Sequence, residues 1–401
     1  MRFIGILGLF VMLGIAWALS TDRRRIPWRT VAAGTGLQLV LALLILKTPW
    51  GRAFFESART WVVAFLDFAD AGSSFIFGEG FTEHFFAFKV LPTIIFFSSV
   101  IAILYYLGAL QLVVKAFARV MMWLLHTSGA ESLSASANIF VGQTEAPLLI
   151  RPYVGAMTRS ELMAVMTGGF ATVAGGVMAL YVGMGISAGH LIAASVMSAP
   201  AALVMAKLMV PETEVSKTAG KVEMAVDVPY VNVIDAAAQG AADGLRLALN
   251  VGAMLLAFLG LIALINAVIA PVGALFGVEG LDLEGILGVL LSPLAFVMGV
   301  PWEEARAVGG LLGIKTGANE LIAYASLSEM IRDQQLSERS QVIATYALCG
   351  FSNFSSIAIQ IGGIGGIAPE RKGDLARLGL RAMIAGSLAC FQTATIAGLL
   401  I

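Results

Sequence analysis

The sequence predicts an all-α integral membrane protein with eight transmembrane helices and two re-entrant helical hairpins. The first observation is composition: of 401 residues, 58% are hydrophobic and only 13% are charged, whereas a soluble domain carries roughly 25% charged residues. The second is a series of apolar segments, because a membrane-spanning helix needs about 20 mostly apolar residues. The third is a pair of polar, interrupted stretches that are unsuited to a lipid-facing helix.

Eight apolar segments are long enough to be spans. They are Phe3–Leu19, Val31–Leu46, Val90–Val114, Leu162–Met184, Leu191–Met209, Leu245–Ile269, Ile343–Ile367 and Leu378–Ile401. Phe3–Leu19 also resembles a cleavable signal peptide, but the arginines that follow it are typical of the flank of a retained span. Two charged segments, Arg52–Phe68 and Lys115–His126, are predicted to be amphipathic helices at the membrane surface.

Charge and cysteine usage narrow the location and the function class. Cytoplasmic loops are enriched in Lys and Arg, so the Arg23–Arg29 loop is predicted to face the cytoplasm. We therefore expect a bacterial inner-membrane protein, surrounded by lipid, with both termini outside. The formal net charge of −1 provides no basic excess for a nucleic-acid partner. Cys349 and Cys390 match no metal-ligand spacing and are predicted to be small buried residues, and no cofactor is expected.

The two polar stretches are Ala130–Tyr153 and Pro301–Met330. Irregular backbone at membrane depth is tolerated only where it is buried in protein or lines a wet cavity, so each stretch is predicted to be a re-entrant hairpin. The middle of the first contains Asn138, Gly142, Gln143, Thr144, Glu145 and Pro147. The second contains Gly309, Gly310, Gly313, Lys315, Thr316, Gly317, Asn319 and Glu320.

The same order of elements occurs twice. A span with Gly169-Phe170-Ala171-Thr172 follows the first hairpin, and one with Gly350-Phe351-Ser352-Asn353 follows the second. The charge pattern places the hairpins on opposite sides, which predicts inverted repeats with binding sites near the midplane. The predicted units are a scaffold of spans and interfacial helices (1–128), a first repeat (129–209), a loop, long span and outer amphipathic segment, mainly scaffold (210–300), and a second repeat (301–401).

Glu145 and Glu320 are the most informative residues, since a carboxylate within the membrane marks a pathway or binding site. A shallow hairpin with a solvated carboxylate is the alternative. Two carboxylates also suggest hydrolysis, but no nucleophile or metal-ligand arrangement accompanies them. Gln143 and Thr144 could read the donor and acceptor edges of a heterocyclic base, although Gln143 could instead only cap a broken helix.

A second polar break contains Phe351, Asn353 and Ser356. Asn353 and Ser356 are three residues apart and would share a helix face, while Phe351 could offer a flat apolar surface to a ring. These neutral groups suit hydrogen bonding of a polyhydroxylated or heterocyclic solute.

Together, Gly142-Gln143-Thr144-Glu145-Ala146-Pro147, Asn319-Glu320 and Gly350-Phe351-Ser352-Asn353-Phe354-Ser355-Ser356 resemble the signatures of the concentrative nucleoside transporters. The resemblance covers nearly the whole chain. It implies a homotrimeric, sodium-driven nucleoside symporter in which a transport domain moves against a scaffold like an elevator. It further implies that the nucleobase contacts Gln143, Thr144 and Glu145 and packs against Val177 and Phe351, and that the ribose binds Glu320, Asn353 and Ser356.

The resemblance also implies a sodium ion near the first hairpin tip, bound by Asn138, Thr172 and the carbonyl groups of Val141 and Val173. Thr172 replaces the serine expected there but keeps the hydroxyl. Ion binding would order the tip for the substrate.

Three alternatives remain open: a proton symporter in which Glu145 or Glu320 carries the proton, a membrane protein that senses nucleosides or gates without moving them, and an intramembrane hydrolase. The preferred nucleoside is not predicted.

Overall fold

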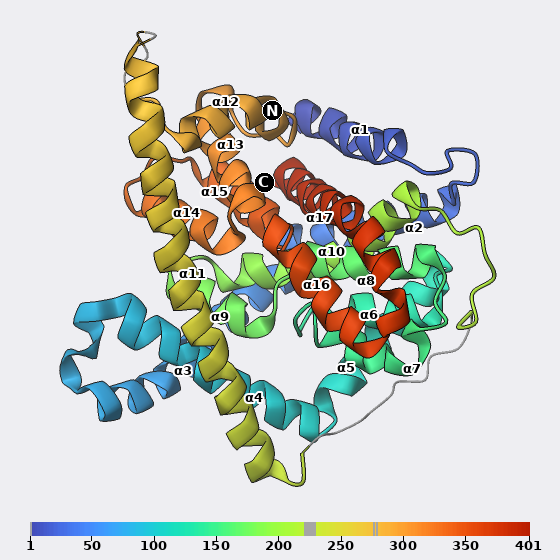
Figure 1. The fold of residues 1–401 in the computed structure, drawn as a ribbon, viewed down its shortest axis with the longest axis horizontal. Helices are drawn as coiled ribbons and strands as arrows, with labels where there is room; N and C mark the ends of the chain where they lie inside the picture. The colour runs from blue at the N-terminus through green and yellow to red at the C-terminus, as the bar shows by residue number, and fades with distance from the viewer. Residues whose placement is uncertain (1, 220–229, 276, 278–279) are drawn as a thin grey trace.

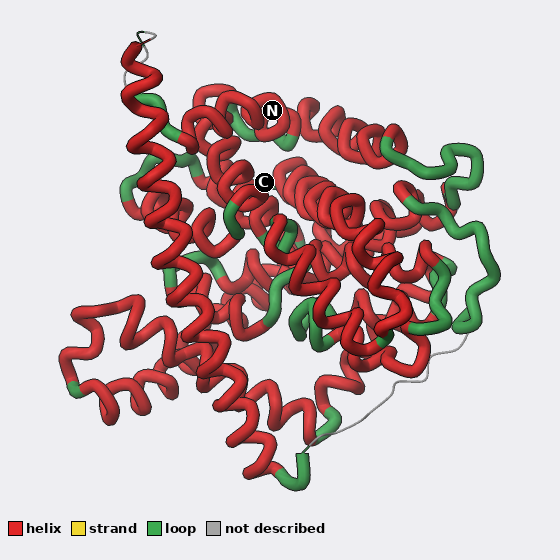
Figure 2. Tube along the Cα trace, viewed as in Figure 1, coloured by secondary structure: helices red, strands yellow, loops and turns green. Residues whose placement is uncertain are grey.

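The computed structural model describes residues 2–219, 230–275, 277 and 280–401. Every regular element in these ranges is a helix (Figure 2), so the predicted all-α fold class is confirmed. Part of the loop that is predicted at the start of the 210–300 unit, residues 220–229, lies outside the described residues.

The first half of the chain, from the N-terminus to Met209, contains ten α-helices and three short helical turns in the described residues (Figure 1). They are α1 (Arg2–Ala18), α2 (Trp28–Lys47), α3 (Pro49–Phe77), a 3₁₀ turn (Glu79–His84), a π-helical turn (Phe85–Val90), α4 (Leu91–Tyr106), α5 (Ala109–Leu125), α6 (Gly129–Ala137), a 3₁₀ turn (Ala146–Ile150), α7 (Arg151–Val154), α8 (Arg159–Ala171), α9 (Gly175–Gly183) and α10 (Ala188–Met209). The predicted surface segments Arg52–Phe68 and Lys115–His126 fall largely on α3 and α5.

The second half begins with the longest helix. It consists of α11 (Val233–Leu275), α12 (Leu283–Val297), α13 (Trp302–Gly317), α14 (Glu320–Arg332), α15 (Glu338–Leu348), α16 (Phe354–Ile367), a 3₁₀ turn (Pro369–Arg371) and α17 (Lys372–Leu400).

Six helical stretches in the described part of the chain are long and apolar enough to cross a membrane. They are Trp28–Lys47, Ala87–Tyr106, Arg159–Gly183, Ala188–Met209, Val233–Leu275 and Pro369–Leu400. A seventh is added if α12 and α13, bent by 116° at their junction, count as one. The predicted number of eight is therefore not confirmed: α1 has only 17 residues, and Ile343–Ile367 is divided between α15 and α16.

The predicted continuous span Val90–Val114 is wrong. Helix α4 ends at Tyr106 and α5 begins at Ala109. Gly108 lies between them with φ +78°, a left-handed conformation that glycine adopts readily and that ends a helix. Hydrophobicity alone hides this boundary, because apolar residues continue on both sides of the glycine.

Helices α8, α10 and α17 form the interior of the molecule. Within the apolar windows of α10 and α17, 89% and 83% of the residues are buried, against 6% for α11. Helix α11 packs along α4 at one side of the molecule (Figure 1). Helix α11 thus exposes an apolar surface, whereas the core helix α8 ends at the first of the polar breaks described below.

Helices α8 and α17 approach closely at Gly386. A Cβ added there would lie 2.4 Å from the Cβ and 3.0 Å from the carbonyl carbon of Phe170, and backbone atoms cannot move aside easily. We expect Gly386→Ala to destabilise the fold by about 1–3 kcal/mol, as overpacked cores do. Gly373→Ala is the matched control, because it lies on the same helix with no atom within 4 Å of its added Cβ. Thermal unfolding in detergent measures both, and equal melting temperatures would contradict this packing.

The same order of elements occurs in both halves of the chain. A helix, a break and a further helical segment (α6 to α7, and α13 to α14) are followed by a broken helix pair (α8 and α9, and α15 and α16) and a long helix (α10, and α17). The first broken pair is interrupted at 172–174, where Thr172 is extended. The second is interrupted at 349–353. The predicted internal repeat therefore has a counterpart in the element order.

Candidate functional site

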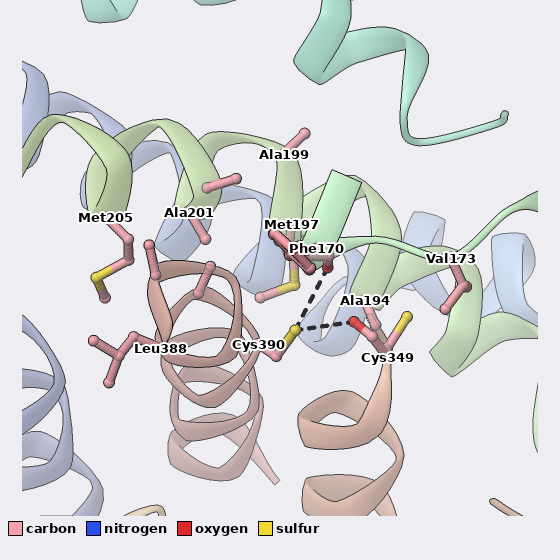
Figure 3. Close-up of a cluster of buried hydrophobic side chains, with 14 of the residues drawn as sticks. Phe170, Val173, Ala194, Met197, Ala199, Ala201, Met205, Cys349, Leu388 and Cys390 are labelled. Atoms are coloured by element: carbon pink, nitrogen blue, oxygen red, sulfur yellow. Dashed lines mark hydrogen bonds between the residues drawn. The ribbon is translucent and has the colours of Figure 1, made fainter. Parts of the chain in front are cut away.

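The breaks of the two divided helices lie against each other. The backbone N–H of Phe351 donates a hydrogen bond to the carbonyl oxygen of Thr172 (3.3 Å). Cys390 of α17 lies beside both helix ends (Figure 3), with its Sγ 3.5 Å from the carbonyl oxygen of Ala171 and 3.1 Å from that of Cys349. Helix ends leave carbonyl groups without helical partners, and α17 satisfies two of them. Both cysteines are buried, as predicted.

Five residues form a hydrogen-bonded series across this junction, through their side chains and the backbone N–H of Ser356, and we call this series the polar chain. Gln143 Nε2 donates to Ser356 Oγ (3.3 Å), and the backbone N–H of Ser356 donates to Asn353 Oδ1 (2.9 Å). Asn353 Nδ2 then donates to Glu320 Oε2 (2.8 Å). Tyr181 donates from its hydroxyl to Glu320 Oε1 (3.2 Å). The polar chain therefore joins the first polar stretch to the second.

Glu320 is the centre of the polar chain and is only 6% exposed. A buried carboxylate is costly unless it is paired or hydrogen-bonded, and each of its oxygens accepts one of the bonds above. It is also the first residue of α14, where the helix dipole favours a negative charge. Asn319 caps the same helix, accepting from the backbone N–H of Ile322 (2.9 Å). The Asn-Glu pair thus builds a helix N-terminus around a buried anion.

Two details of the predicted site are corrected. Asn353 does not share a helix face with Ser356; it is the N-cap of α16, and its side chain accepts from the Ser356 backbone. Gln143 does not cap a broken helix. Its amide is used across the interior, donating to Ser356 and accepting from Gln360 Nε2 (3.0 Å). The same residues come together as predicted, but α16 begins at Phe354, one residue after Asn353, so Asn353 lies outside the helix that their spacing suggests.

Glu145 and Thr144 lie at the edge of the junction. Glu145 is exposed and lines a cavity of about 1060 Å³. The cavity lies between the first polar stretch and the start of α9 on one side and α4 and α11 on the other. Thr144 lies against Gly363 of α16, Val177 is buried in α9, and Phe351 is half-buried. The two carboxylates that the sequence weights equally therefore have different surroundings.

The predicted sodium ligands lie at two helix C-terminal ends. Asn138 follows α6, and Thr172 follows α8. Asn138 is 1% exposed, and its Oδ1 accepts no hydrogen bond from any residue that the structure describes. Thr172 donates to the Gly168 carbonyl group (3.0 Å), which leaves its hydroxyl lone pairs available. Val173 is fully buried, and Val141 is half-buried. Neutral oxygens at half-helix C-terminal ends are the kind of ligand that sodium finds in transporters.

Sequence reasoning missed Tyr181 and Gln360. Gln360 is fully buried and donates to both Gln143 Oε1 (3.0 Å) and the Met166 carbonyl oxygen (3.1 Å). It follows Ser356 by four residues in an apolar helix, so it shares a face with a residue already singled out. Tyr181 follows Val177 by the same spacing. Helical spacing from the predicted residues would have found both.

Three family models match successive parts of the chain. "Na+ dependent nucleoside transporter N-terminus" matches residues 7–80, "Nucleoside recognition" matches residues 87–188, and "Na+ dependent nucleoside transporter C-terminus" matches residues 190–398. Together they cover both polar stretches and every residue of the polar chain.

Individual relatives agree with these models. The chain is 48% identical to an uncharacterized transporter of Haemophilus influenzae, with 99% of this chain and 97% of that protein covered. It is 43% identical to mouse sodium/nucleoside cotransporter 1 over its whole length, but spans only 64% of the mouse protein. The solved structure of CNTnw in an inward-facing substrate-bound state is 47% identical, with a TM-score of 0.94 over 100% of this chain and 98% of that one. The chain therefore belongs to the Na⁺-dependent nucleoside transporter family and is a transporter rather than an enzyme.

Proposed function

We propose that the protein is a secondary active symporter that imports nucleosides, driven by a sodium gradient. The polar chain is the observation that supports this most directly. Its members offer both donors and acceptors at the junction of two broken helices, and such junctions hold the substrate sites of transporters with internal repeats. Because these side chains satisfy one another, a nucleoside can exchange its own hydroxyl and base groups for them without stranding a buried polar atom.

The two parts of the nucleoside are assigned to the two ends of the polar chain, the ribose to the Glu320 end and the base to the Gln143 end. The ribose hydroxyls donate to Glu320 and bind Asn353 and Ser356, because a carboxylate is a strong acceptor for a diol. The base lies toward the cavity and the first polar stretch, where it contacts Gln143, Thr144 and Glu145. Val177 and Phe351 supply apolar surface for its ring. This places the sugar in the interior and the base nearer the cavity of about 1060 Å³.

Sodium binds beside the substrate at Asn138, Thr172 and the carbonyl groups of Val141 and Val173. The free Oδ1 of Asn138 supports this site. Thr172 connects the ion to the substrate, since its carbonyl oxygen accepts from the N–H of Phe351. An ion that orders residues 172–173 therefore also orders the break that carries Phe351 and Asn353, and this provides the coupling.

We further propose that residues 129–209 and 301–401 form a moving transport domain with two re-entrant hairpins. The scaffold comprises residues 1–128 and 210–300, and an elevator-like motion carries the site across the membrane. The exposed apolar length of α11 suits a scaffold that meets lipid and other copies in a homotrimer. The protein lies in a bacterial inner membrane with both termini outside. Contact between Gly5 of α1 and Leu399 of α17 supports termini on one side.

Uptake of labelled uridine by purified protein in proteoliposomes tests the function. We expect concentrative uptake with an inward sodium gradient, none with choline in place of sodium, and collapse when an ionophore dissipates the gradient. Equal uptake with sodium and choline, increasing with an inward proton gradient, would instead establish proton coupling. Saturable binding without net flux of uridine or of any purine nucleoside would show a sensing protein.

A further inference from the structure

Lys315 of α13 is a buried cation for which the proposed transport mechanism has no role. It is fully buried (0% exposed) and ranks among the largest such side chains. No carboxylate lies within 4.0 Å of its Nζ in the described ranges, in contrast to Lys207, the other buried lysine there, whose Nζ is 2.7 Å from Glu131 Oε2. A charge placed in a protein interior without a partner is expensive. The cost of burying the Lys315 ammonium group must therefore be offset by other interactions, and its presence suggests a role in the protein.

The surroundings of Lys315 supply that compensation. Its Nζ donates to the carbonyl oxygen of Ala347 (2.8 Å) and lies 5.8 Å from the ring centroid of Phe391, within the range of a cation–π contact. Ala347 is in the last turn of α15, where carbonyl groups lack helical partners and the helix dipole is negative. The ammonium group therefore neutralises a helix C-terminus that ends inside the molecule.

This helix end leads directly into the polar chain. Helix α15 is followed by the break 349–353, which contains Asn353, and Asn353 Nδ2 donates to Glu320 Oε2 (2.8 Å). Lys315 also interacts electrostatically with Glu320, five residues farther along the same polar stretch. Tyr324 of α14 secures the same end, donating its hydroxyl to the Thr345 carbonyl oxygen (2.7 Å). The second polar stretch thus holds the break through side chains on both sides of Glu320.

The two broken helix pairs then have parallel arrangements. Helix α8 ends at Ala171, directly before two of the proposed sodium ligands, and α15 ends directly before the break that reaches Glu320. Each pair then has a cation at the C-terminal end of its first half: the proposed exchangeable sodium ion in one, and the covalently tethered ammonium group of Lys315 in the other.

We propose that Lys315 is a positioning residue for the ribose subsite. Its charge fixes the end of α15, and with it Asn353, whose amide donates to Glu320, and it places a buried positive charge on the same polar stretch as that carboxylate. This inference rests on the proposed function, because it takes Glu320 as the ribose acceptor.

A comparison of uridine with 2′,3′-dideoxyuridine, which lacks the ribose diol, tests the inference. We expect Lys315→Met to increase the KM for uridine uptake by about tenfold or more, the size of losing a hydrogen bond to a charged group. The KM for the dideoxy compound should remain within about twofold, and Lys315→Arg should retain the preference for uridine. In a Glu320→Gln background, Lys315→Met should add little further loss, because both changes act on the same interaction. The double variant Lys207→Met/Glu131→Gln is the matched control, because it removes another buried lysine together with its partner carboxylate, and it should leave the discrimination unchanged.

Several outcomes separate the two hypotheses. Wild-type protein that transports both compounds equally would contradict the ribose assignment itself. Discrimination lost in Glu320→Gln but kept in Lys315→Met, or equal loss of both substrates in Lys315→Met, would overturn the role of Lys315 alone. If Lys315→Met is not recovered as folded protein, the double variant Lys315→Met/Glu320→Gln should be, since it leaves no uncompensated buried carboxylate. Failure of that rescue would also overturn the inference.

Discussion

Glu320→Gln is expected to reduce kcat/KM for nucleoside uptake by about tenfold to hundredfold, which corresponds to hydrogen bonds to a charged group at about 1.5–3 kcal/mol. Glu320 is buried and lies at the N-terminus of α14, with one oxygen facing Asn353 and the other Tyr181. In the proposed complex its charge accepts from the ribose hydroxyls. A neutral amide of the same shape is a weaker acceptor and directs an N–H₂ group toward those hydroxyls.

The Gln variant should still fold. Its amide oxygen can accept from Asn353 Nδ2, and the Tyr181 hydroxyl can accept from its amide nitrogen instead of donating. Glu329→Gln is the matched control, because Glu329 lies on the same helix but is exposed. Uptake kinetics should be measured alongside thermal unfolding of both variants. Normal uptake by Glu320→Gln, or loss that follows loss of folded protein, would remove Glu320 from the substrate site.

The order of helices could be predicted from the sequence because hydrophobicity is a property of each segment alone. The two polar stretches are interrupted as composition indicates, and the segments predicted to be amphipathic helices fall largely on α3 and α5. Boundaries set by a single backbone conformation could not be predicted in this way. Gly108 separates α4 from α5 inside an apolar run, and Asn353 moves the start of α16 past a residue that periodicity would include.

The sequence predicts most of the residues that gather at the candidate site, but not which of them form hydrogen bonds with one another. Gln143, Glu320, Asn353 and Ser356 are brought together as the motifs suggest, because polar groups in a membrane segment must find each other. Which of them pair depends on how the two halves dock, and no local pattern encodes that docking. Gln360 and Tyr181 complete the arrangement from helices that look purely apolar. The motif also fails to predict burial, because Glu145 is exposed whereas Glu320, the same side chain in the other polar stretch, is buried.

Asn138→Ala is expected to increase the sodium concentration that supports half-maximal uptake by about tenfold or more, since even indirect partners of a metal contribute 10–100-fold to its affinity. The Asn138 side chain ends α6 with Oδ1 unused by the described residues, while its Nδ2 donates to the Ser134 carbonyl oxygen (3.1 Å). Removing it deletes one proposed ion ligand and leaves the polar chain intact. Apparent nucleoside affinity should therefore decrease at low sodium and recover as sodium is increased, because the ion and the substrate bind with a shared coupling free energy.

Thr167→Ala is the matched control for this experiment. Thr167 is as deeply buried on α8, and its Oγ1 also lacks a partner among the described residues, but it is not a proposed ligand. Initial rates of uptake over a sodium series at several uridine concentrations separate the two variants. A sodium series shifted for Asn138→Ala and unchanged for Thr167→Ala would tie the ion to the end of α6. An equal shift in both would mean that sodium dependence follows general packing of α6 against α8, and no shift in either would move the ion site elsewhere. Recovery of the apparent nucleoside affinity of Asn138→Ala at high sodium would distinguish a lost ion ligand from a damaged substrate site. In that case the polar chain still binds the nucleoside when the sodium concentration is high enough to occupy the weakened ion site.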